Sequence, residues 1–214
     1  SVPGAVAAFV RRGREVRLEP LDVEAVAALC VALLRCEPAP AFAAAVHRLS
    51  SGLPGLAVPL LASCAANGVR GERAEAAALD AIAVPSLPTE VESRLEGLAP
   101  SARRTAEAAA VLGEPLRADV LAAAAEVEAT ALVVATSQLV DAGLFAAGPG
   151  LRWRSPLLAT AARSLVAPGV ASSMAVRAAS VLHRTRAPAG EVAALLIDAP
   201  PVGAPRRRST TPAA

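Results

Sequence analysis

Apolar residues recur at helical spacing along most of the chain and predict a series of short helices. Asp22 is a favourable N-cap residue, and a helix beginning after it carries one apolar side, made of Val23, Val26, Leu29, Leu33 and Leu34. The prolines within 36–40 end this helix. Two more helices are predicted over 41–49 and 56–66, so residues 22–70 are expected to form a small helical bundle.

A second group of helices is predicted after a connector. Residues 71–86 contain Gly, Arg and Pro, and we interpret them as the connector between two subdomains. Beyond it, successive apolar segments begin at Pro, Ser or Thr and end at Gly. These signals predict helices over 88–98, 100–112, 116–126 and 129–142.

A hairpin signal follows these helices. Residues 144–147 and 151–154 flank Gly148-Pro149-Gly150 and are expected to pair as two short strands. Several helices followed by a two-stranded hairpin is the order of a winged-helix domain, which is expected over 87–167. An antiparallel helix pair is predicted after it, over 172–185 and 189–198.

Composition supports a mainly all-α fold. The chain of 214 residues is 54% hydrophobic, chiefly Ala, Leu and Val, which is ample for a core. Strand-favouring aromatic residues are rare, being Phe9, Phe42, Phe145 and Trp153. The predicted fold is therefore a helical bundle, a winged-helix domain with one short β-hairpin, and an antiparallel helix pair.

Charge and cysteine usage exclude several function classes. All 21 basic residues are Arg, and the net charge of +2 does not by itself indicate a nucleic-acid partner. The arginine clusters near both ends and at 103–104 are interpreted as solvated faces or tails. No Cys-x-x-Cys pair occurs, and His47 and His183 have no partner at ligand spacing. Neither a metal site nor a disulfide framework is predicted.

The ends of the chain and its apolar runs carry no targeting signal. The short apolar run 5–10 precedes its arginines, which is the reverse of a secretory signal. The longest uncharged run, 129–140, is too short to span a bilayer. These features predict a cytoplasmic protein with no membrane contact.

Several short motifs occur in a fixed order and at fixed intervals. They read Leu87-Pro88, Arg94-Leu95-x-x-Leu98, Ala108-Ala109-Ala110-Val111-Leu112-Gly113, Leu139-Val140-Asp141-Ala142-Gly143-Leu144-Phe145, and Leu151-Arg152-Trp153-Arg154-Ser155-Pro156-Leu157-Leu158. In order and spacing they resemble the middle of the LuxR-type large ATP-dependent transcriptional regulators, which are signalling ATPases of the STAND class. Arg17 to Asp22 resembles the last strand of the ATPase core, Ser50 to Leu56 the lid motif, and Val192 to Pro201 the start of the helical arm.

This resemblance implies an organisation for the whole chain. Residues 1–21 would end the ATPase core, 22–70 would be the helical lid, and 87–167 the winged-helix domain. Residues 168–201 would begin the helical-repeat arm, and 202–214 would be a disordered tail. The implied partners are an upstream ATPase core and a downstream arm of the same protein, and homo-oligomerisation is compatible with the family.

The resemblance also implies four site residues. The lid turn, with Gly52 and Pro54, would lie over the adenine of bound ATP or ADP. Arg154 occupies the arginine position at the wing, and Ser155 stands where the family has a phosphate-sensing histidine. A serine hydroxyl forms hydrogen bonds but carries no charge, so the sensor differs from the family pattern.

A phosphate-binding loop of the Gly-x-x-x-x-Gly-Lys type is excluded, because the sequence contains no lysine. The chain is therefore expected not to be an enzyme and to bind no cofactor on its own. By the resemblance, ATP or ADP would be bound only together with the upstream ATPase core. The expected function is a nucleotide-state-sensing lid and winged-helix module of such a regulator.

Two alternatives stay open at the level of sequence. In the first alternative the chain is a stand-alone winged-helix DNA-binding regulator. In the second it is a helical protein-interaction scaffold, with an enzyme of unknown class as a remote variant. The recognition helix of a DNA-binding domain would be Thr130 to Asp141, which contains no Arg and offers only Gln138 to a base. We therefore expect no direct DNA contact.

Overall fold

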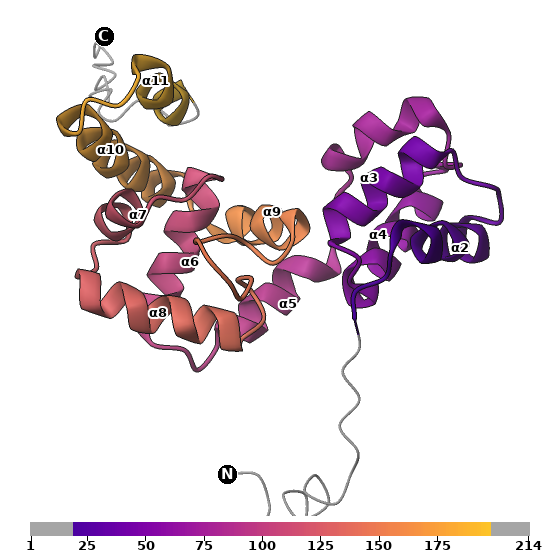
Figure 1. Cartoon of the computed structure of the whole chain (residues 1–214), viewed down its shortest axis with the longest axis horizontal. Coiled ribbons are helices and arrows are strands. Elements are labelled where there is room, and N and C mark those ends of the chain that lie inside the picture. Colours follow the sequence, from indigo (N-terminus) through magenta and orange to yellow (C-terminus); the bar gives the residue numbers. More distant parts are fainter. Residues whose placement is uncertain (1–18, 198–214) are drawn as a thin grey trace, which may run out of the picture.

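The computed structural model describes residues 19–197, and in this range the secondary structure consists of helices joined by turns. Figure 1 shows two groups of helices, one on each side of the view. We call the first group, α2 to η1, the first lobe; it contains α2 (Val23–Leu34), α3 (Pro40–Ser50), α4 (Pro54–Ala66) and the 3₁₀ helix η1 (Arg73–Ala81). The remaining helices, α5 to α11, form the second lobe.

The first lobe is a bundle around α3. This helix packs against α2, α4 and η1, and Phe42 in its first turn is fully buried. Asp22 caps α2 as the sequence predicts, since its Oδ1 accepts a hydrogen bond from the Ala25 N–H at 2.8 Å. The helix η1 lies inside the segment expected to be a connector. It is stabilised by a capping box in which the side chains of Glu72 and Glu75 each accept from the other's backbone N–H.

The second lobe is built around α6, which contacts α7, α8, α9 and α10. Its helices are α5 (Ser86–Leu95), α6 (Pro100–Leu112), α7 (Ala118–Ala125), α8 (Ala129–Asp141), α9 (Pro156–Leu165), α10 (Pro168–Arg184) and α11 (Ala189–Ile197). Buried alanines on α6, among them Ala102, Ala106 and Ala109, let these helices approach closely. The mainly all-α prediction is confirmed.

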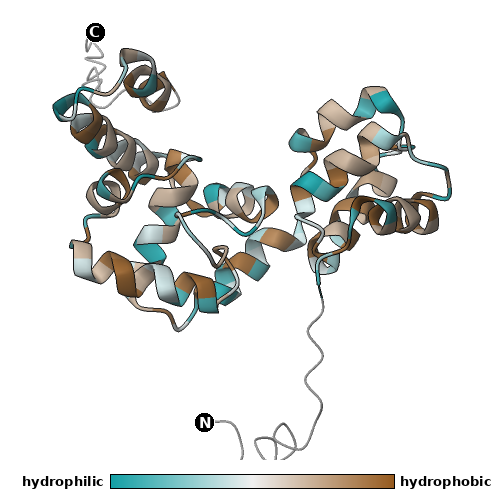
Figure 2. Cartoon of the chain, viewed as in Figure 1, coloured by the Kyte–Doolittle hydropathy of each residue, from teal (hydrophilic) through white to brown (hydrophobic). Residues whose placement is uncertain are grey.

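The outermost helix, α11, packs on α10 and has no buried residue. Figure 2 shows hydrophobic colour on this helix and on α8. The side chain of Ile197 is 80% exposed at its end, and Val133 on α8 is 69% exposed. Both helices therefore present apolar surface to solvent. No single helix within residues 19–197 has the length and apolar character needed to cross a membrane.

The predicted β-hairpin is wrong in its extent. Within the described range no strand forms; two isolated antiparallel bridges, Phe145 with Trp153 and Leu116 with Leu151, take its place. Left-handed backbone limits the pairing on both sides, since Gly143 has φ +69° at the end of α8 and Gly150 has φ +86° in the turn. The expected core strand near residue 17 lies outside the described residues.

Candidate functional site

The lid turn is held against the start of the first lobe. The Leu21 N–H donates to the Gly52 carbonyl oxygen at 2.8 Å. Gly52 has φ +68°, and a Cβ placed on it would lie 2.3 Å from the Leu21 carbonyl oxygen. The glycine is thus required by close approach of the chain's own backbone. Pro54 is exposed as the first residue of α4, a position that proline favours.

Ser155 links the two lobes. Its side chain is the N-cap of α9, where Oγ accepts from the Leu157 N–H at 3.2 Å. The same hydroxyl donates to the Leu49 carbonyl oxygen near the end of α3, at an Oγ–O distance of 2.6 Å and across 106 residues of sequence. Ser155 is 1% exposed. Both hydrogen-bonding capacities of the hydroxyl are therefore used inside the protein.

Arg154 extends away from this buried serine. Its backbone N–H donates to the Leu144 carbonyl oxygen at 2.9 Å and fixes the segment before α9. A Cβ placed on Gly143 would lie 3.1 Å from the Arg154 Nη1 atom. The guanidinium of Arg94 lies on the same glycine, with its Nη1 donating to the Gly143 carbonyl oxygen at 3.2 Å, and it pairs with Glu90. Two guanidinium groups therefore share the surroundings of Gly143.

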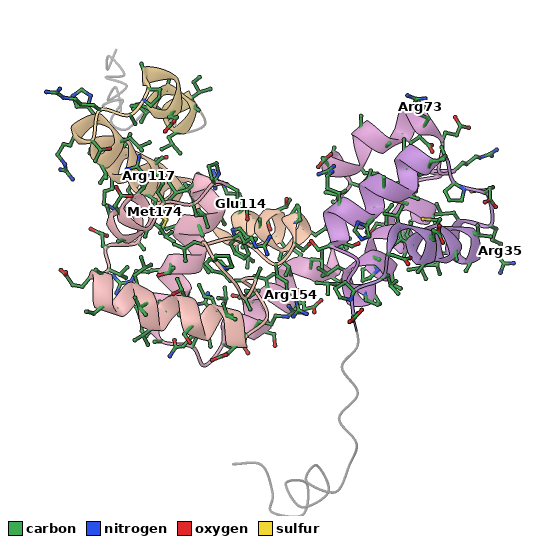
Figure 3. The ribbon with its side chains drawn as sticks, in the orientation of Figure 1. Arg35, Arg73, Glu114, Arg117, Arg154 and Met174 are labelled. Atoms are coloured by element: carbon green, nitrogen blue, oxygen red, sulfur yellow. The ribbon has the colours of Figure 1, made fainter. Side chains whose placement is uncertain are left out.

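A cleft of about 560 Å³ lies where the end of α3, the bridged segment (residues 144–154) and the start of α9 meet. Its lining includes Arg48 and Ser51 from the first lobe and Glu114, Arg152, Arg154 and Thr160 from the second. Figure 3 shows Glu114 beside α9 and Arg154 near α5. Of the four residues expected at a site, Arg154 alone lines this cleft. Ser155 is buried directly after it in the chain, and Gly52 and Pro54 lie outside the lining.

Three arginines and one carboxylate give the cleft lining a positive balance. The Arg48 Nη2 atom contacts both oxygens of Asp80, on η1, at 2.8 and 3.1 Å. Glu114 Oε1 accepts from the Trp153 backbone N–H at 2.7 Å. Arg152 and Arg154 form no side-chain hydrogen bond or ion pair within residues 19–197. The cleft thus offers unpaired positive charge to a ligand.

Trp153 forms part of the cleft wall. The residue is 5% exposed, and its ring packs edge to face on Phe145, with 5.1 Å between ring centroids. Its indole Nε1 is buried and finds no hydrogen-bond acceptor in the part of the chain that the structure describes. A buried donor without a partner is uncommon in folded proteins.

The cleft has the character of a binding site. Within the described range, no group of three His, Cys, Asp or Glu side chains is placed to hold a metal ion. The buried thiols lie elsewhere: burial raises the pKa of Cys30 and of Cys64 to about 11, which keeps both protonated at neutral pH. Arginines and hydroxyls line the cleft itself, and these groups recognise anions.

Of the residues that line this cleft, sequence reasoning had named Arg154 and had not named Arg48, Arg152 or Glu114 as site residues. One signal was available. Arg152 and Arg154 alternate in a segment expected to be extended, where residues two apart share a face. Arg48 carries no such signal, because it reaches the cleft only through packing of α3 on α9. Comparisons with protein-family models, curated proteins and solved structures find no match to this chain.

Proposed function

We propose that this chain is the nucleotide-state-sensing lid and winged-helix module of a STAND-type, ATP-dependent transcriptional regulator, and that it is non-catalytic on its own. One observation carries the proposal. The Ser155 hydroxyl stands where the family has its sensor histidine, and it bonds the Leu49 carbonyl oxygen three residues before the lid turn at Gly52. The residue expected to report nucleotide state is thus bonded to the element expected to cover the nucleotide.

The order of elements in the second lobe supports the winged-helix part of the proposal. Helix α6 is followed by the bridged residue Leu116, then by α7 and α8, and then by the bridged residues Phe145, Leu151 and Trp153. Helix, strand, two helices and a returning pair of strands is the order of a winged helix. Here each strand is reduced to one or two bridged residues.

The proposed switch uses the contact between the lobes. An upstream ATPase core would supply ATP or ADP binding, residues 22–70 the lid, and 168–201 the start of the arm that receives the signal. The Ser155–Leu49 hydrogen bond would exist in one nucleotide state and break in the other. A ligand shifts such an equilibrium only through contacts that differ between the two states. The whole protein would act in the cytoplasm.

The surroundings of α8 argue against the DNA-binding alternative. The Gln138 Oε1 atom accepts a hydrogen bond from the Ala99 N–H at 3.3 Å, so this side chain is engaged inside the lobe. The exposed side of α8 carries Val133 and Val134, which are 69% and 56% exposed. Aliphatic side chains without arginine do not form a phosphate-binding surface. Exposed valines favour instead the helical-scaffold alternative, in which α8 would contact another protein.

Two measurements test the proposed function. The coding sequence upstream of Ser1 is expected to encode, in frame, a phosphate-binding loop within a few hundred residues, and a start codon adjacent to Ser1 would contradict the assignment. With magnesium-ATP, the chain itself is expected to show no turnover above the buffer blank and no binding tighter than micromolar, because it has no loop that cradles phosphates. Sub-micromolar affinity in calorimetry would contradict the second expectation.

A further inference from the structure

Helix α8 has no charged side chain before Asp141 at its last position. Four of its solvent-facing residues recur at intervals of three and four, and they are Thr130, Val133, Val134 and Ser137. The two valines are 69% and 56% exposed. The outward side of a surface helix ordinarily carries charged residues, whereas an uncharged stripe at this spacing is ordinarily packed against another element. We call this stripe the α8 face.

An uncharged groove of about 320 Å³ continues the α8 face toward the bridged segment. Val133 and Val140 line it from α8, and Phe145 and Leu151 line it from the bridged segment. In contrast to the arginine-lined cleft, its lining contains no charged residue. A groove beside an apolar stripe is the kind of surface that receives the apolar side of a second helix.

Acidic residues stand at both ends of the α8 face. Glu128 directly precedes α8 and Asp141 is its last residue, and both are exposed. Neither carboxylate forms an ion pair with any group in residues 19–197. Since a helix of 13 residues is about 20 Å long, the two acids lie about that distance apart.

The position of Asp141 is unfavourable for α8 by itself. The carbonyl groups at the end of a helix carry partial negative charge, which destabilises an acid in the last turn and favours a cation there. No basic residue occupies the last turn of α8. A cation supplied by a partner would therefore interact favourably with both Asp141 and these carbonyl groups.

We propose that the α8 face binds an amphipathic helix of a partner protein, with a basic residue near each end of its apolar stripe, about 20 Å apart. The apolar side chains of the partner contact Val133 and Val134 and enter the groove, and its basic residues pair with Glu128 and Asp141. Partner binding at this face is independent of nucleotide sensing at the lid.

Charge argues against two other occupants of the α8 face. A second copy of α8, packed in either direction, would bring carboxylates against carboxylates at both ends, and like charges repel. Helices that lie on membranes carry Lys or Arg on their polar side, and α8 contains neither.

The test uses the full chain and two labelled synthetic peptides, followed by fluorescence anisotropy at an ionic strength of about 0.15 M. The first is a helix-forming peptide of about 20 residues, with leucines at intervals of three and four and an arginine at each end of that stripe, about 13 positions apart. The second has glutamate in place of both arginines. The arginine peptide is expected to bind with a Kd of about 100 μM or lower, and the glutamate peptide about tenfold more weakly.

Three variants locate the binding surface and its charge recognition. Val133→Asp places a charge in the apolar stripe and is expected to weaken binding of the arginine peptide more than about tenfold. Val58→Asp, at a valine of α4 that is 41% exposed, is the matched control and leaves binding unchanged. Asp141→Asn is expected to weaken the arginine peptide about twofold to fivefold and to tighten the glutamate peptide. A purely structural role of Asp141 would change both peptides in the same direction.

Several outcomes would overturn the proposal. Absence of saturable binding of the arginine peptide up to about 1 mM removes the site, since that concentration exceeds the expected Kd about tenfold. Equal affinity for the two peptides removes the basic partner, and equal weakening by Val133→Asp and Val58→Asp places the peptide elsewhere. Self-association of the chain that Val133→Asp abolishes would assign the face to a second copy, and vesicle binding that Val133→Asp abolishes would assign it to lipid. The upstream coding sequence decides the regulator assignment independently of these results.

Discussion

Replacing Ser155 with Ala removes one oxygen that serves two elements. The Oγ atom accepts from the Leu157 N–H at 3.2 Å and donates to the Leu49 carbonyl oxygen at 2.6 Å. Losing an N-cap costs about 0.5–2 kcal/mol. Leaving the buried carbonyl oxygen without its donor costs about 1–3 kcal/mol. Since the two losses overlap in one site, Ser155→Ala is expected to lower the free energy of unfolding by about 2–4 kcal/mol.

Urea unfolding measures this loss with two probes. Circular dichroism reports all helices, whereas fluorescence of Trp153 reports the second lobe alone. With an m value of about 2 kcal/mol/M, the midpoint should fall by about 1–2 M urea. Because Leu49 belongs to the first lobe, losing its bond to residue 155 should also separate the midpoints of the two probes.

Two control variants sharpen the result. Ser155→Thr keeps a hydroxyl at this extended residue and should recover most of the loss. Ser180→Ala removes a hydroxyl that bonds its own helix at the Val176 carbonyl oxygen, at an exposed position, and should change stability by no more than about 0.5 kcal/mol. If Ser155→Ala costs no more than Ser180→Ala, the reasoning about the link between the lobes is refuted.

Three further predictions concern the lid turn, the thiols and DNA. Gly52→Ala should lower the free energy of unfolding in urea by about 3 kcal/mol or more. The new Cβ would lie 2.3 Å from the Leu21 carbonyl oxygen, and the residue would have to keep φ at +68°. A neutral effect would contradict this. At pH 8 a maleimide should label Cys36 first, because burial raises the pKa of Cys30 and Cys64 to about 11 and leaves each with a thiolate fraction of about 0.1%. Labelling of Cys30 and Cys64 should accelerate as the pH rises toward 11. Equal labelling rates for the three cysteines at pH 8 would contradict this. Duplex DNA should bind no tighter than micromolar at physiological salt because α8 carries no arginine, and nanomolar anisotropy binding that is lost on replacing Gln138 would contradict this.

The helices were predictable because their signals are local. The predicted helix 100–112 has the observed bounds, with Pro100 at its first turn and Gly113 after its end. The predicted starts at 41 and 56 are one and two residues late, because Pro40 and Pro54 each open a helix at a position where proline is favoured. Helix η1 was missed because its stability comes from the Glu72–Glu75 capping box and from packing on α3, which leave little apolar periodicity.

The site was predictable only in part, because its contacts join distant segments. Ser155 was found through the wing motif, yet nothing near it in sequence indicates Leu49 as its partner 106 residues away. Gly52 was identified correctly as a tight turn, but its close neighbour proved to be the backbone of Leu21. Arg48 reaches the cleft through the packing of α3 on α9. Tertiary placement of this kind does not appear as a periodic pattern in the chain.

The hydrogen bond between the Leu21 N–H and the Gly52 carbonyl oxygen has a mechanical consequence. Tension applied to the chain ahead of residue 19 would not be absorbed by uncoiling α2. It would pass across this bond to the lid turn, then along three residues to Leu49, and through the Leu49 carbonyl oxygen to Ser155 at the start of α9. Short hydrogen bonds in series, here of 2.8 and 2.6 Å, transmit displacement with little slack. A pull at the amino-terminal end would therefore reach the lid turn first and, through Leu49, the cap of a helix in the opposite lobe.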